Sequence, residues 1–282
     1  MKATFTVHTD EKTSRRLTLG GMLASNAGVF PDDQVEYFLR NENRGQLPEL
    51  LSLVSRLGRD QRFALPEAVK DDSRGMPVPS DLAQHWEKRW KDVWEIKADF
   101  AGLIVPKPPT LYRARLVLMH EKGSSSPELL YRSNEKLMKG TCTHWKYCSE
   151  SLDEKVPTHN FTGTFGCWVE DADEAPFGNL AGINFHANAV RELRQFGVRT
   201  TTLPVRLALG ADVYLENDSK KQLDMNVTTT CAESETAGGA VPLVDFRRER
   251  GKVCVGGWSP VSADGFIRFR RAVYPVQSSS LP

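Results

Sequence analysis

The sequence predicts an α+β fold, and three observations support that prediction. Residues 3–9 alternate apolar and polar side chains as a strand does, apolar residues at helical spacing follow, and most later segments again show strand patterns. Strands separated by one mainly helical region favour an antiparallel sheet that carries an insertion. We therefore expect a core formed by 1–44 and 106–276, a helical insertion at 45–105 and a flexible tail at 277–282.

Two helices are expected inside the insertion. Segment 47–57 places leucine and valine at positions i, i+3, i+4 and i+7, with Pro48 in its first turn and Gly58 at its end. Segment 80–100 follows Pro79, and Ser80 suits the N-cap. Three tryptophans of this second helix are spaced by four residues, namely Trp86, Trp90 and Trp94. We expect them to form its buried face; the alternative is that they stack bases beside the basic side chains Lys88 and Arg89.

The remaining elements follow from shorter patterns. A short helix is expected at 32–44 and another at 187–196, because apolar side chains there recur at helical spacing. Alternating or continuous apolar runs predict further strands, at 111–119, 161–169, 203–209, 222–230, 252–255 and 266–273.

The last forty residues carry the strongest functional signal. Seven basic residues stand against three acidic ones between positions 245 and 271, and the two expected strands there flank a glycine-containing turn. Glycine lets a backbone approach a ligand closely, and its N–H can face an anion, so this segment favours a phosphate chain. The candidate RNA-binding residues are Arg247, Arg248, Arg250, Lys252, Gly256, Gly257, Trp258, Arg268, Arg270 and Arg271, with Lys88 and Arg89 from the insertion.

Within 266–271, strand alternation would place Phe266, Arg268 and Arg270 on one face. Such a face would combine phosphate contacts with base stacking. The alternative is an ordinary surface hairpin whose arginines are solvated.

Composition limits the other possibilities. The chain has 282 residues and a formal net charge of +1, so nucleic-acid binding would have to depend on local patches. Five cysteines at irregular spacing do not indicate a disulfide framework, and no apolar run is long enough to span a membrane, so we expect a cytoplasmic protein without a membrane partner. No nucleophile elbow, phosphate-binding loop or dinucleotide fingerprint occurs, and no cofactor is expected.

A metal site is the less favoured interpretation of one cluster. The residue types would suit zinc, but the spacing lacks a paired Cys-x-x-Cys motif, so free thiols are expected. The cluster consists of Cys142, His144, Cys148, His159 and Cys167.

The C-terminal segment resembles the glycine-rich loop of the repeat-associated RNA-binding proteins of CRISPR systems. The matching residues are Gly256, Gly257 and Gly265, and strand 3–9 stands where the first strand of that family would stand. The resemblance implies a ferredoxin-like (RRM-like) antiparallel core and a role in an antiviral ribonucleoprotein with other effector-complex subunits. It also implies metal-independent endonuclease cleavage of precursor repeat RNA.

That family often carries a histidine soon after its first strand, whereas this chain has none between His8 and His85. Cleavage assisted by arginine or tyrosine is therefore the expected form. The candidates near the scissile phosphate are Arg15, Arg16, Tyr37 and Arg40.

Three functions remain open from the sequence. The leading hypothesis is a guide-RNA-binding protein that processes repeat RNA and stays bound to the product. The second is a non-catalytic RNA-binding subunit that forms the backbone of an effector complex. The third is a capsid-like protein whose basic tail only coats nucleic acid.

Overall fold

The computed structural model describes most of the chain after residue 74. The described residues are 75–109, 113–176, 179–180, 183–184, 186–192, 194, 199–217, 222–247, 251–262, 264 and 266–275. The expected core segment 1–44, the first helix of the insertion and the tail at 277–282 lie outside these residues.

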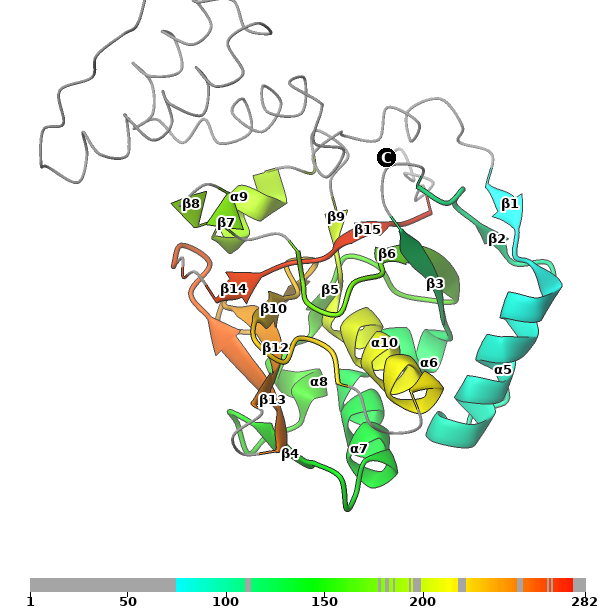
Figure 1. Ribbon diagram of the computed structural model, residues 1–282, viewed down its shortest axis with the longest axis horizontal. Helices are drawn as coiled ribbons and strands as arrows, with labels where there is room; N and C mark the ends of the chain where they lie inside the picture. Colours follow the sequence, from blue (N-terminus) through cyan, green and yellow to red (C-terminus); the bar gives the residue numbers. More distant parts are fainter. Residues whose placement is uncertain are drawn as a thin grey trace, which may run out of the picture.

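Two sheets enclose one helix, α10 (Leu203–Glu216) (Figure 1). The four-stranded sheet has the order β3-β6-β15-β9, and its neighbours pair antiparallel. The five-stranded sheet has the order β14-β10-β12-β13-β4, with antiparallel central pairs and parallel pairs at both edges. The described elements therefore confirm an α+β fold.

The strands of the first sheet are β3 (Ala114–Met119), β6 (Phe165–Glu170), β15 (Arg271–Val273) and β9 (Arg199–Thr200). Those of the second are β14 (Ile267–Arg268), β10 (Thr228–Thr230), β12 (Val241–Arg247), β13 (Lys252–Trp258) and β4 (Thr143–Lys146).

Short elements complete the described chain. Three two-stranded pairs are β1 (Met76–Pro77) with β2 (Ile104–Val105), β5 (Thr158–His159) with β11 (Ser234–Glu235), and β7 (Asn179–Leu180) with β8 (Ile183–Asn184). The other helices are α5 (Ser80–Trp94), α6 (Glu121–Ser124), α7 (Pro127–Leu137), α8 (Leu152–Lys155) and α9 (Ala187–Glu192).

Helix α10 corrects the prediction of a strand at 203–209. Every residue from Leu203 to Tyr214 is buried, because the helix contacts β3 of one sheet, β12 of the other, and α7. A helix that is buried on all sides shows little 3.6-residue periodicity, and its apolar run resembles a buried strand in sequence. Thr202 begins the helix, since its hydroxyl accepts a hydrogen bond from the N–H of Val205.

Helix α5 confirms the expected tryptophan face. Trp86, Trp90 and Trp94 are buried. The indole N–H groups of Trp86 and Trp90 donate to the carbonyl oxygens of Leu116 and Leu118 on β3, at 2.9 and 2.8 Å. These rings therefore hold α5 against the four-stranded sheet and do not offer stacking surfaces to a ligand.

The ends of α5 differ from the prediction. Pro79 occupies the N-cap position and Ser80 is the first helical residue, without a side-chain cap. The helix stops at Trp94 because Glu95 adopts a left-handed conformation, with φ of 57°.

The expected strand 266–273 is divided between the two sheets. Ile267 and Arg268 pair with β10, and Arg271 begins the strand that pairs with β9 and β6. The chain changes sheets at Arg270, whose side chain is fully buried. A single alternating strand was therefore the wrong description of this segment.

Several other predicted elements are confirmed with different limits. The strand at 161–169 is Phe165–Glu170, the helix at 187–196 is Ala187–Glu192, and the strand at 222–230 is Thr228–Thr230. Strand 252–255 continues through both glycines to Trp258. Within the described residues, no helix has the length and apolar character needed to cross a bilayer.

A buried charge cluster joins the elements at this crossover. Asp224 is fully buried and accepts from Arg206 at 2.8 Å and from Arg270 at 2.6 Å. The hydroxyl of Thr229 also donates to its carboxylate. Burial alone would raise the pKa of Asp224, but the two guanidinium groups outweigh that effect and lower the pKa.

We predict that Asp224→Ala destabilises the protein by about 3–5 kcal/mol, because it leaves two buried guanidinium groups without a counter-charge. Urea unfolding at neutral pH measures this loss. The control is Lys136→Ala, which removes the exposed Lys136–Glu95 pair and should cost less than about 1 kcal/mol. Equal effects of the two substitutions would contradict the assigned role of Asp224.

Candidate nucleic-acid interface

The five-stranded sheet has one packed face and one partly open face. Val244, Val253 and His144 line a cavity of about 20 Å³ together with residues of α7 and α10, so this face looks into the core. Side chains alternate along a strand, and the neighbouring residues therefore point outward. On the outward face, Val241, Leu243 and Cys254 are buried, which limits the open area to β4, the two ends of β13 and the hairpin end of β12.

Three large aromatic side chains stand on or beside this open area. Trp145 on β4, Tyr147 just after it, and Trp258 at the end of β13 are 44%, 40% and 39% exposed. Strand register places Trp145 opposite Cys254, four residues before Trp258. From the usual strand rise and spacing, the Cα atoms of the two tryptophans are about 14 Å apart.

Two basic residues lie at the other end of the same face. Arg247 pairs with Lys252 across the hairpin, and Lys252 pairs in turn with Thr143 on β4. Arg247 is exposed, and its Nε makes a long contact of 3.5 Å with Oδ2 of Asp245. The surface formed by Arg247, Lys252, Trp145 and Trp258, with Gly256 between them, is called the aromatic–basic face below. Tyr147 lies at its edge, because its ring contacts Gly257, whose Cβ position is on the opposite face of β13.

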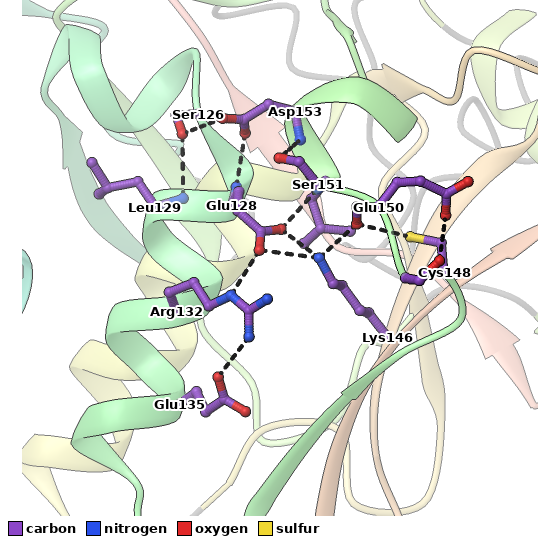
Figure 2. A network of polar contacts seen from close by, with 12 residues as sticks. Ser126, Glu128, Leu129, Arg132, Glu135, Lys146, Cys148, Glu150, Ser151 and Asp153 are labelled. Carbon is purple, nitrogen blue, oxygen red and sulfur yellow. Dashed lines mark hydrogen bonds and ion pairs between the residues drawn. The ribbon is translucent and has the colours of Figure 1, made fainter.

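Lys146 fixes the orientation of β4 (Figure 2). Its side chain is 8% exposed, and Nζ lies 2.8 and 3.0 Å from the two carboxylate oxygens of Glu128 on α7. Nζ also donates to the carbonyl of Glu150 at 2.6 Å. Because Lys146 points inward, Trp145 must point outward.

Glu128 is held by more than Lys146. Its carboxylate also accepts from the backbone N–H of Leu152 and from Nε of Arg132, at 2.7 and 2.8 Å (Figure 2). Partial burial tends to raise the pKa of Glu128, and these donors together lower it below its usual value. The carboxylate therefore stays ionised and joins α7, β4 and α8 near neutral pH.

Two predicted RNA-binding arginines are corrected by the structure. Arg270 is 0% exposed and pairs with Asp224, and Arg271 is 6% exposed and pairs with Glu170. Buried guanidinium groups that neutralise buried carboxylates cannot reach a phosphate on the surface. Both serve the core.

The other predicted contacts are spread over the molecule. Arg268 lies on β14, at the opposite edge of the sheet from β4. Lys88 and Arg89 belong to α5, on the far side from β13 (Figure 1), where they pair with Asp92 and Asp212. Of the predicted contacts within the described residues, only Arg247, Lys252, Gly256, Gly257 and Trp258 lie near Trp145 and Tyr147.

Six predicted residues lie outside the described part of the chain. These are the catalytic candidates Arg15, Arg16, Tyr37 and Arg40, and the turn residues Arg248 and Arg250.

One further polar cluster lies between α5 and α10. Asp212 is almost fully buried and accepts from His85, Arg89 and Arg115, at 2.8, 2.8 and 3.1 Å. Ligand atoms of His85, Asp212 and Glu216 lie close enough together to hold a metal. However, Arg115 donates to both carboxylates, and a cation in that position disfavours a metal ion. The cluster therefore joins α5, β3 and α10.

The cysteines of the less favoured zinc cluster form no disulfide bonds within the described residues. All five cysteines are unpaired by disulfides, and burial raises the pKa of the Cys142 thiol. Among the described residues, no group of candidate ligands other than the His85 cluster is close enough to hold a metal.

Sequence reasoning missed Trp145 and Tyr147. Segment 143–147 alternates Thr143, Trp145 and Tyr147 with His144 and Lys146, a two-residue period that indicates a strand. The cysteines and histidines in and around this segment suggest a metal site instead of a strand.

Comparison with known proteins adds no relative: no family model, curated protein or solved structure matches this chain.

His144 and His159 predict acid sensitivity. Burial lowers the pKa of each imidazole from 6.5 to about 4, so both are neutral in the folded protein and become protonated in the unfolded chain below pH 6.5. Stability should therefore fall as the pH drops from 6.5 towards 4. His144→Phe keeps a ring against Tyr131 and should reduce this acid-induced loss by about 1–3 kcal/mol at pH 4.

Urea unfolding at pH 7 and pH 4 measures this difference. An identical acid-induced loss in the wild type and in His144→Phe would contradict the assignment of a neutral, buried His144.

Proposed function

We propose that this protein binds single-stranded RNA on its aromatic–basic face. The observation that carries the proposal is the grouping of two exposed tryptophans, Trp145 and Trp258, with Arg247 and Lys252 on one sheet surface. Exposed apolar side chains that gather on one surface beside polar groups are typical of an interaction site. Aromatic rings stack on unpaired bases, while cations contact the connecting phosphates.

Single strands suit this face better than a duplex. In a duplex the faces of the bases are covered by their neighbours, whereas an unpaired strand offers them to side chains. The estimated 14 Å between Trp145 and Trp258 exceeds the 3.4 Å base separation of a stacked strand, so the two rings would contact different, non-adjacent bases. The choice of RNA over DNA comes from the sequence resemblance.

The narrower form of the proposal is a guide-RNA-binding subunit of a CRISPR effector complex with a ferredoxin-like core. It includes cleavage of repeat RNA without metal. Its support is the glycine-containing C-terminal segment, whose Gly256 and Gly257 lie beside the exposed rings.

Copurification tests the narrower form. A single discrete short RNA bound to the protein supports a guide-RNA role, and a random mixture of fragments contradicts it. Incubation with hairpin repeat RNA in EDTA then tests cleavage: intact RNA together with intact binding removes the nuclease claim.

We predict that Trp145→Ala and Trp258→Ala each weaken binding to a single-stranded RNA about 5- to 100-fold, the range expected for one lost stacking contact. Both side chains are exposed, so the unfolding free energy should change little. Fluorescence anisotropy with a labelled 12-nucleotide RNA measures the affinity. The matched control is Ile104→Ala, an exposed apolar side chain on β2, which should bind as the wild type does.

We also predict a shallower salt dependence when the two cations are removed. Each phosphate contact on a single strand contributes about −0.7 to the slope of log affinity against log salt, so Arg247→Gln with Lys252→Gln should reduce the slope by about 1.4. Titrations at several salt concentrations give the slope. Lys88→Gln serves as the control, and an unchanged slope in the double variant would contradict phosphate contacts at this face.

A further inference from the structure

Gly256 is unexplained by the fold. It lies inside β13, opposite Leu243, and its φ is outside the left-handed region that favours glycine. A Cβ placed there would meet no atom within 4 Å. Glycine weakens a strand interior, and where packing does not require it, it often marks the close approach of a ligand.

The other glycines within the described strands have neighbouring atoms at their Cβ positions. At Gly166 on β6, a Cβ would lie 2.4 Å from a methyl group of Val105, which excludes any side chain. At Gly257, a Cβ would lie 3.4 Å from Cζ of Tyr147, so the ring rests against the strand. Gly256 differs from both because the space above it is open.

Aromatic side chains stand around this open position. Trp258 is two residues further along the same face of β13, about 6.6 Å away by the rise of a strand. Trp145 stands on the same face of the neighbouring strand, opposite Cys254. Tyr147 contacts the Cβ position of Gly257 and so lies on the other face of β13. Bare backbone at Gly256 therefore forms the low point between exposed rings.

We infer that Gly256 is the floor of a slot for one unpaired nucleobase, and that its missing side chain determines whether the base can enter. This inference rests on the proposed RNA binding and adds the position of one base. A stacked base is about 3.4 Å thick, which fits within the estimated separation of Gly256 and Trp258. A side chain at position 256 would fill the slot.

The test is a size series at one position, Gly256→Ala, Gly256→Val and Gly256→Leu, with binding to a 12-nucleotide uridine RNA measured by anisotropy. We expect thermal stability to be unchanged or slightly raised, because a Cβ meets no neighbour and a strand gains from losing glycine. Affinity should fall progressively with side-chain size, by at least tenfold for leucine. Thr143→Leu, on the same face but opposite Lys252, four residues before Gly256, should change affinity less than twofold.

The outcomes separate this inference from the proposed function. If the wild type binds, Trp145→Ala weakens binding and Gly256→Leu binds normally, the slot is wrong and the RNA-binding face stands. If the wild type does not bind the RNA, both fail. If Gly256→Leu does not fold, the alanine and valine variants decide: unchanged affinity in both overturns the slot.

Discussion

The inward anchoring of Lys146 determines what β4 presents to solvent. A buried ammonium group must remain close to its carboxylate partner, and Glu128 is itself held by Leu152 and Arg132. A one-residue shift of the strand would bury Trp145 and expose the charge of Lys146, so the ion pair selects one register. The open aromatic surface is thus a consequence of an electrostatic contact on the opposite face of the same strand.

Ion pairing also distinguishes the basic side chains that stabilise the core from those that can contact a ligand. Arg270 and Arg271 form ion pairs with Asp224 and Glu170 in the interior. Arg247 and Lys252, in contrast, lie on the surface at the end of a hairpin. A chain with a net charge of +1 can therefore present a local basic site without being basic overall. Sequence clustering alone could not distinguish these two groups of arginines, because burial decides their role.

Sequence periodicity predicted those elements that have one buried face and one solvated face. The spacing of Trp86, Trp90 and Trp94 identified a buried helical face, because one side of α5 packs on a sheet while the other is solvated. The same method failed for Leu203–Glu216, where two sheets cover all sides of the helix and erase its periodicity. It also failed at Arg270, where the chain leaves one sheet for the other although the sequence still alternates.

The sequence predicted only part of the aromatic–basic face. Trp258 and the cations of the hairpin belong to one segment and could be recognised together. Trp145 lies about 110 residues earlier in the sequence and comes close to them only through the parallel pairing of β4 with β13.

Photo-crosslinking tests the central claim most directly. A single-stranded RNA that carries a photoreactive uridine would be irradiated with the full-length protein, and the attached peptides identified by mass spectrometry. We expect crosslinks at Trp145 or Trp258 that disappear when unlabelled single-stranded RNA competes for the site. Crosslinks confined to other surfaces, such as helix α5, would contradict it.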